Sequence, residues 1–233
     1  MADKGSVKVY RHELKYYLGY HDYQVAAGIL RDIMKPDPFA GPGGDYWIRS
    51  LYFDSIDDRD YYDKMLGLSR RKKIRLRLYD PSQTTVKLEV KNKFNEYMMK
   101  ETASLTAADA MELIRGNRAV LLRSPDNPAL RKVFYLMSQD YYLPKVIVDY
   151  EREAYIGDLQ NLRVTFDKNI RASFSNVDLF NPDIHMTAVF DSETMVMEVK
   201  YDRFLPGWLQ DILATFTGQR YAISKYCLSR ALY

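Results

Sequence analysis

The sequence predicts an α+β fold built around a large antiparallel sheet. Stretches rich in β-branched and aromatic residues recur from near the first residues to nearly the last. Neighbouring strands are joined by short turns rather than by a regular crossover helix after each strand. Several strands carry charged side chains on one face and apolar side chains on the other. Because β-rich domains often reach this size, we expect one domain over residues 1–233.

The first half of the chain combines strands with two helices. The strands are recognised by alternating apolar residues, and the longer helix by apolar residues at helical spacing. Prolines and glycines between residues 36 and 44 predict a loop, and Pro81-Ser82-Gln83 predicts a turn. The expected strands cover residues 7–18, 46–53, 70–80 and 84–94, and the helices cover residues 21–34 and a short segment after Asp57.

The second half begins with helices and returns to strands. Thr106 is suited to cap the N-terminus of a helix, and Gly116 is suited to end it. A Gly-Asp pair predicts a turn between the next two strands. The expected helices cover residues 107–116, 128–138, 206–217 and 222–232, and the expected strands cover residues 144–156, 161–171 and 194–201.

The charged strand faces repeat one spacing. Residues two apart on a strand point to the same face, so each charged pair would lie on one side of the sheet. A half-exposed strand in water explains any one of these faces, but adjacent cationic strands repel one another. The repetition therefore predicts a surface that binds a highly charged molecule. The pairs are Glu13/Lys15, Glu89/Lys91, Glu198/Lys200 and Arg75/Arg77.

If these faces line a closed barrel, the apolar faces point outward and must be covered by helices. Guanidinium groups bind phosphate oxygens through two parallel hydrogen bonds, and lysine adds compact positive charge. A magnesium or manganese ion takes one or two carboxylates together with phosphate oxygens. The expected guest is therefore a nucleoside triphosphate, or a longer phosphate chain, with a metal ion.

Other chemistries find little support. The net charge of +3 argues against a nucleic-acid binder, and Cys227 is the single cysteine, so an intrachain disulfide is excluded. The chain has no P-loop and no dinucleotide-binding glycine motif, and its three histidines show no metal-ligand spacing. With no signal peptide and no long apolar run, we expect a cytoplasmic protein without a membrane segment.

Eight short segments, in order along the chain, resemble the VTC-type polyphosphate polymerase domain. That family belongs to the triphosphate tunnel metalloenzyme (CYTH-like) superfamily. Each motif is short, but the ordered set covers nearly the whole chain. The segments are RHELKYYL (11–18), SLYFDS (50–55), KIRLRLY (73–79), LEVKNK (88–93), YEREAY (150–155), LRVTFDKNI (162–170), MEVKYD (197–202) and SKYCLSR (224–230).

The resemblance implies an antiparallel β-barrel that forms a triphosphate tunnel, with helices packed on the outside. It implies Glu198 as the main ligand of Mn²⁺ or Mg²⁺ and Glu13 as a second acid. Lys200, Lys225 and Arg163 would act at the reacting phosphate. The implied phosphate ligands are Lys15, Arg75, Arg77, Lys87, Lys91, Arg152, Arg163, Lys200 and Lys225.

The implied activity is transfer of the γ-phosphate of ATP to a growing polyphosphate chain with release of ADP. A triphosphatase or nucleotidase of the same fold and a non-catalytic polyphosphate-binding module are the alternatives. Hydrolytic members of the superfamily begin with an E-x-E-x-K strand, whereas this chain has Arg11 at the first acidic position, which favours the polymerase. ATP and inorganic polyphosphate are the expected partners, with a membrane protein as a further candidate. The oligomeric state, the primer and the direction of chain growth stay open.

Overall fold

The structure is a computed structural model that describes residues 11–95, 97–216 and 221–232, without the side chain of Arg11. These residues belong to two compact units, each with its own hydrophobic core. Unit 1 contains Met1–Asp45, Glu153–Asp167 and Glu193–Ala222, and unit 2 contains Tyr46–Arg152, Lys168–Ser192 and Ile223–Tyr233. The single domain expected over residues 1–233 stays a prediction.

Unit 1 is a small antiparallel sheet with helices on one face. The strands β7 and β8 run from one unit into the other, so each unit contains part of both. The elements of unit 1 are β1 (Arg11–Leu18), α1 (Tyr20–Ile33), β2 (Lys35–Pro36), the end of β7 (Leu143–Ile156), the start of β8 (Arg163–Ser173), β10 (Met195–Asp202) and α5 (Gly207–Thr215).

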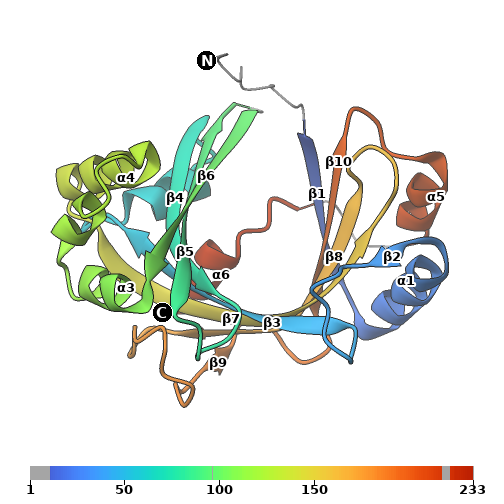
Figure 1. The fold of residues 1–233 in the computed structure, drawn as a ribbon. Helices are drawn as coiled ribbons and strands as arrows, with labels where there is room; N and C mark the ends of the chain where they lie inside the picture. Colours follow the sequence, from blue (N-terminus) through green and yellow to red (C-terminus); the bar gives the residue numbers. More distant parts are fainter. Residues whose placement is uncertain (1–10, 96, 217–220, 233) are drawn as a thin grey trace. The chain divides into compact units, whose positions relative to one another are not determined.

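Alternation along the strands divides the two faces of the unit 1 sheet. Leu14 of β1, Phe166 of β8 and Met197 of β10 lie in the core, and Leu30 of α1 and Leu209 of α5 pack against them. Figure 1 shows α1 and α5 beside the strands β8 and β10. Because successive strand residues point to opposite faces, the charged residues between these positions lie on the face away from the core.

Unit 2 is a larger antiparallel sheet, also covered by helices. Figure 1 shows α3 and α4 on the side of β4, β5 and β6. The elements are β3 (Asp45–Asp54), α2 (Arg59–Met65), β4 (Arg70–Leu78), β5 (Thr85–Phe94), β6 (Tyr97–Thr106), α3 (Ala107–Ile114), the 3-10 helix η1 (Arg118–Leu122), α4 (Pro128–Gln139), β9 (Thr187–Ala188) and α6 (Lys225–Arg230), with the other parts of β7 and β8.

The core of unit 2 lies between the sheet and these helices. Leu76 of β4 and Leu88 of β5 are fully buried and pack with Leu113 of α3 and Val133 of α4. Both helices have a side-chain cap: the Thr106 hydroxyl accepts a hydrogen bond from the Asp109 backbone N–H at 3.0 Å, and the Asn127 side chain caps α4. The expected cap at Thr106 is therefore confirmed.

The α+β class, the antiparallel sheet and the helical cover of its apolar faces are confirmed. The strand order is β1-β10-β8-β7-β3-β4-β5-β6, with β2 beside β7 and β9 beside β8. Within the described residues this hydrogen-bonded path ends at β1 and β6. The sheet is therefore not closed into the expected barrel, because closure requires the first and last strands to pair with each other.

Most elements lie where the sequence places them, and β6 is the main exception. The segment YMMKETASLT lacks the alternation that marks the other strands, and it forms a strand because it pairs with β5 along ten positions. The expected first strand begins at residue 7, and its residues 7–10 lie outside the described part of the chain. No helix in the described ranges is both long and apolar enough to cross a membrane.

Candidate functional site

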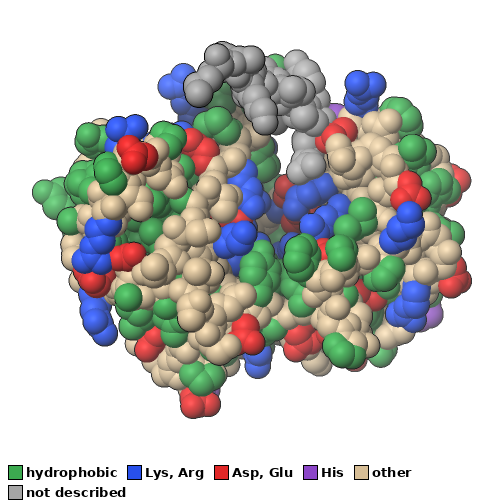
Figure 2. All heavy atoms as spheres, in the orientation of Figure 1, with side chains coloured by type: hydrophobic (Ala, Val, Ile, Leu, Met, Phe, Trp, Pro, Cys, Tyr) green, Lys and Arg blue, Asp and Glu red, His purple; other side chains and the backbone are tan. Residues whose placement is uncertain are grey.

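Strand register in unit 2 places charged and polar side chains side by side on the face away from the helices. Arg75 of β4 lies opposite Glu89 of β5 and Tyr52 of β3, and Arg77 lies opposite Lys87 and Ser50. Figure 2 shows lysine and arginine side chains near the region where Figure 1 draws β4, β5 and β6. This surface, defined by β3, β4 and β5, is the cationic face of unit 2.

Arg75 is balanced by a buried carboxylate. Its Nε and Nη2 atoms lie 2.7 and 2.6 Å from Oε2 of Glu89, and its Nη1 atom donates to the Tyr52 hydroxyl at 3.1 Å. Lys100 of β6 also pairs with Glu89. Burial would raise the pKa of Glu89, but the positive charges of Arg75 and Arg77 hold it well below its usual value.

The same arginines act on a neighbouring phenol. Burial raises the pKa of Tyr52, but Arg75, Arg77 and Lys73 lower it more, and the net result is a pKa of about 8. A phenol normally titrates near pH 10. The lowered value shows that the cationic face exerts a strong positive potential on groups that lie within it.

Arg77 has neutral partners instead. Its side chain is nearly buried, its Nε donates to the Ser50 hydroxyl at 3.1 Å, and its Nη2 donates to the Tyr150 hydroxyl at 2.8 Å. Within residues 11–95, 97–216 and 221–232, no carboxylate forms an ion pair with Arg77. The ionised Glu89 acts on Arg77 only at longer range, and no carboxylate of the described residues touches the buried guanidinium, so this position favours the binding of an anion.

The ring of Tyr150 brings together cations from three elements. The Lys225 Nζ atom of α6 lies 4.9 Å from the ring centroid, and the Arg152 guanidinium of β7 lies 5.3 Å from it. With Arg77 on its hydroxyl, this tyrosine contacts three of the expected phosphate ligands. Arg152 therefore lies on the side of the cationic face, a point that strand parity alone does not decide.

The remaining expected ligands of unit 2 lie on β5. Lys91 is half-buried and lies opposite Lys73, whose Nζ donates to the Ser224 hydroxyl at 2.6 Å. Lys87 lies opposite Arg77 on the same face, but its side chain is exposed. Lys87 is therefore positioned at the solvent-accessible end of the row.

Replacing Glu89 with glutamine is expected to lower the free energy of unfolding by about 3 kcal/mol at pH 7, because Arg75 would lose its buried counter-charge. The pKa of Glu89 is lower in the folded protein than its ordinary value of 4.5. The contribution of the ionised Glu89 to the free energy of unfolding is therefore complete above about pH 5 and is lost as the pH falls below about 5. Urea unfolding at several pH values measures this, and the difference between wild type and variant should narrow in acid.

Glu112→Gln is the matched control for this prediction. Glu112 pairs with the exposed Arg123 on the surface of unit 2, so its replacement should change the free energy of unfolding by about 0.5 kcal/mol or less. An equal loss of stability in the two variants, or a constant difference from pH 7 down to acid, would contradict the role given to Glu89.

Unit 1 carries a second charged cluster, with alternating signs on neighbouring strands. In the register of β1, β10 and β8, Lys15 lies opposite Glu198, and Lys200 lies between Glu13 and Arg163. The Lys15 Nζ atom is 2.6 Å from Oε1 of Glu13 and 3.5 Å from Oε2 of Glu198, and Lys200 also pairs with Glu198. Burial would lower the pKa of Lys15, but the carboxylates of Glu198 and Glu13 raise it above its usual value.

The carboxylates of this cluster are compatible with a divalent cation that also binds phosphate. The described residues contain no group of three or more His, Cys, Asp and Glu side chains that could hold a metal by themselves. Glu198 lies opposite Thr165, whose buried hydroxyl has no hydrogen-bond partner among the described residues. Magnesium needs only one or two carboxylates when phosphate oxygens complete its shell, so Glu198 and Glu13 fit that role.

Arg163 is already balanced by an acid in the structure. Its Nη2 atom pairs with the buried carboxylate of Asp37, which follows β2, and the Asp37 backbone N–H donates to the Ala154 carbonyl at 2.8 Å. A ligand phosphate at Arg163 would therefore share the guanidinium with Asp37.

Several side chains of the site were not among the expected ligands. Tyr150 stands two residues before Arg152 on one strand, and Ser50 and Tyr52 have the same spacing on β3, so strand parity was the available signal. Asp37 lies in a proline-rich loop, and no sequence pattern connects it with Arg163.

The fold and the charged strand faces define an antiparallel α+β protein with basic and acidic side chains on the strand faces away from its cores. Residues 10–233 match the VTC domain, and the chain belongs to the VTC domain family. The expected family is thereby confirmed. No curated protein matches the chain.

A solved structure shares this fold, and a second is reported beside it. The adenylyl cyclase-like protein HpAC1 from Hippeastrum, described with a dominant triphosphatase activity, is 12% identical, with 94% of each chain covered and a TM-score of 0.55. An adenylate cyclase-like protein from Bacillus halodurans is 12% identical, with 92% of this chain and 95% of that chain covered and a TM-score of 0.49. At such identities the likeness to HpAC1 shows the fold alone.

Proposed function

We propose that this protein is a metal-dependent polyphosphate polymerase, which transfers the γ-phosphate of ATP to a polyphosphate chain and releases ADP. The observation that carries the proposal is Arg77, a buried guanidinium with neutral partners beside Arg152 and Lys225. Such a cluster favours a polyanion, because guanidinium and ammonium groups bind phosphate oxygens strongly. Membership of the VTC domain family supports the same ligand class.

The proposed step needs no proton transfer by the protein. A terminal oxyanion of the acceptor chain attacks the γ-phosphorus of ATP and forms a new P–O–P bond. The bond from the γ-phosphorus to the β,γ-bridging oxygen breaks, and its electron pair leaves with ADP. The protein contributes by aligning the two phosphates and by stabilising negative charge on the transferred group.

The residues divide by role. Glu198, with Glu13, would hold Mn²⁺ or Mg²⁺, which neutralises phosphate charge when it is bound. Lys200, Lys225 and Arg163 are the proposed groups at the reacting phosphate. Phosphates of ATP and of the chain would be bound by Lys15, Arg75, Arg77, Lys87, Lys91, Arg152, Arg163, Lys200 and Lys225.

ATP and inorganic polyphosphate are thus the proposed ligands. The cytoplasm is the proposed location, and a membrane protein that moves the product is a proposed further partner. A triphosphatase is the second candidate function, favoured by the fold shared with HpAC1, for which a dominant triphosphatase activity is described. A polyphosphate-binding module without turnover is the third.

Incubation of the purified protein with ATP and Mn²⁺ tests the proposal. We expect ADP and long acid-labile phosphate chains in matching amounts, with neither product when a chelator removes the metal. Gel electrophoresis of the chains and a coupled assay for ADP measure the outcome. Release of orthophosphate alone would identify a triphosphatase, and tight binding of tripolyphosphate without ADP release would identify a binding module. Either result would refute the polymerase.

A further inference from the structure

The short helix α6 begins with Lys225 and contains six residues. The preceding Ser224 caps it, because its hydroxyl accepts hydrogen bonds from the Cys227 backbone N–H at 3.3 Å and from Lys73 Nζ at 2.6 Å. A helix of this length is not stable by itself in water. The position of Lys225 therefore depends on the contacts that hold α6 against the rest of unit 2.

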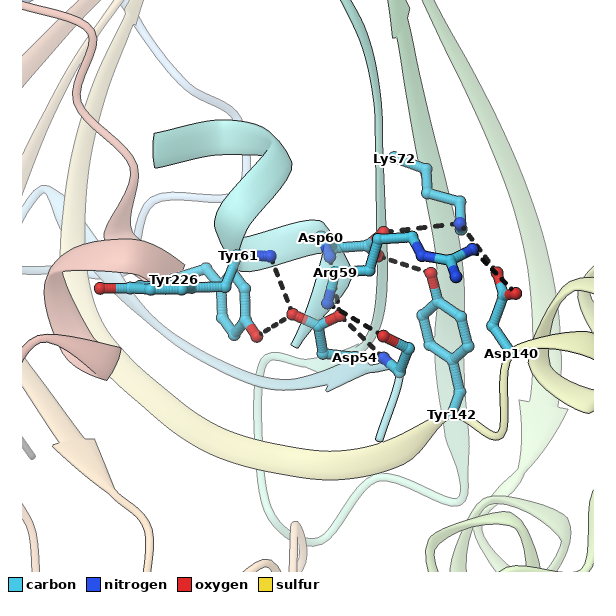
Figure 3. A network of polar contacts seen from close by, with 9 residues as sticks. Asp54, Arg59, Asp60, Tyr61, Lys72, Asp140, Tyr142 and Tyr226 are labelled. Atoms are coloured by element: carbon cyan, nitrogen blue, oxygen red, sulfur yellow. Dashed lines mark hydrogen bonds and ion pairs between the residues drawn. The ribbon is translucent and has the colours of Figure 1, made fainter. Parts of the chain in front are cut away.

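The carboxylate of Asp54, at the end of β3, provides one such contact. The side chain is completely buried, and Figure 3 shows it between α2 and the ring of Tyr226 in α6. Both oxygens accept two hydrogen bonds each, so the buried charge is well compensated. The donors are the backbone N–H groups of Ser55 (2.7 Å), Asp60 (2.9 Å) and Tyr61 (2.9 Å) and the hydroxyl of Tyr226 (2.5 Å).

The ring of Tyr226 continues this contact toward the cationic face. It stacks on Tyr52 with 5.2 Å between ring centroids and an interplanar angle of 30°. Burial and the Asp54 carboxylate raise the pKa of Tyr226, so its hydroxyl stays protonated and donates at all physiological pH values. At the other end of α6, Arg230 pairs with Asp58 at 2.6 Å.

We infer that Asp54 is a positioning residue, which fixes α6 through the Tyr226 hydroxyl and thereby holds Lys225 beside Tyr150. The inference rests on the proposed function, because Lys225 is there assigned to the phosphates. The hydrogen bonds of Asp54 would then contribute to phosphate binding as well as to stability. In this role neither Asp54 nor Tyr226 needs to touch the phosphate.

Tyr226→Phe tests the inference, because it removes one hydroxyl and keeps the ring that stacks on Tyr52. Calorimetry would measure tripolyphosphate binding by this variant, by Lys225→Gln and by the double variant. We expect the Tyr226→Phe change to weaken binding about tenfold when Lys225 is present and less than about twofold when it is absent. Such a result would mean that the hydroxyl acts through Lys225.

Tyr142→Phe is the matched control. Tyr142 is buried in the same unit and donates to the Asp60 side chain at 2.8 Å, so its loss removes another tyrosine–aspartate hydrogen bond (Figure 3). Asp60 reaches Asp54 only through its backbone N–H, which the Tyr142→Phe change leaves in place. Burial raises the pKa of Asp60 to about 7, and the pKa of Tyr52 is about 8, so all variants are measured at about pH 7.5, where most of the carboxylate is ionised and most of the phenol is protonated. We expect this variant to bind tripolyphosphate within about twofold of wild type.

Two outcomes would overturn the inference: an equal loss of binding with and without Lys225, or the same loss in Tyr142→Phe. Failure of the proposed function gives a different result. A protein that binds tripolyphosphate with the expected coupling, but makes no polyphosphate, would keep the positioning role and refute the polymerase. If wild type does not bind tripolyphosphate, the proposed ligand class is wrong. Hydrogen exchange of the backbone amides of Cys227 and Leu228 then tests whether Tyr226 holds α6 in place. Faster exchange in Tyr226→Phe than in wild type would support the positioning role, and unchanged exchange would refute it.

Discussion

Arg77→Ala is expected to lower kcat/KM for polyphosphate formation by about 100- to 1,000-fold, since truncating one partner of a buried charge pair, here with a substrate phosphate, costs about 3 to 4 kcal/mol. The guanidinium is nearly enclosed and donates to Ser50 and Tyr150, so its direction is fixed before substrate binds. Steady-state kinetics with ATP measure the loss. Arg77→Lys should recover only part of it, because an ammonium cannot form two parallel hydrogen bonds to one phosphate.

Arg123→Ala is the matched control for Arg77→Ala. Arg123 is half-exposed in unit 2 and pairs with Asp109 and Glu112, so its removal should leave kcat/KM within about twofold. Circular dichroism and thermal unfolding must show that Arg77→Ala is folded. A folded Arg77→Ala variant with kcat/KM close to that of wild type would refute the assignment of Arg77 to the phosphates.

Glu198→Gln is expected to lower kcat at saturating ATP by about 1,000-fold and to raise the Mn²⁺ concentration needed for half-maximal rate. The carboxylate is nearly buried and lies among Lys15, Lys200 and the Thr165 hydroxyl, so glutamine keeps its shape but removes the charge that a metal requires. Rates measured over a Mn²⁺ titration separate loss of metal binding from loss of the fold.

Two comparisons sharpen the result for Glu198. Glu13→Gln should give a smaller loss, because Glu13 is the second acid and is more exposed than Glu198. Glu101→Gln, in a surface ion pair with Lys132, should leave both kcat and the Mn²⁺ dependence unchanged. If Glu198→Gln loses rate but keeps the wild-type Mn²⁺ dependence, Glu198 is not the metal ligand.

Strand faces and their charges were predictable from the sequence, because side-chain direction on a strand follows from parity alone. That rule places Arg75 and Arg77 together and separates them from Leu76, as the structure confirms. Helices with strong caps, such as the one after Thr106, were also predictable. The strand β6 was not, because its pairing with β5 rather than its own composition defines it.

The partners of the charged residues were beyond the reach of sequence alone. The sequence places Glu89 on one strand face with Lys91, but it does not reveal the ion pair that Glu89 forms with Arg75 of the neighbouring strand. Asp37 meets Arg163 across 126 positions of the chain, and Tyr226 meets Asp54 across 172. Such contacts depend on the tertiary fold, which local patterns do not encode.

The alternating charges of unit 1 also affect how a polyanion would leave. Lys15 and Lys200 are already paired with Glu13 and Glu198 before any ligand arrives. A phosphate that binds these lysines replaces existing ion pairs instead of neutralising bare cations, so less of the Coulomb energy appears as net affinity. The same exchange allows the carboxylates to re-form their ion pairs with the lysines when the phosphate dissociates. A surface of this kind suits passage of a lengthening chain better than its permanent retention.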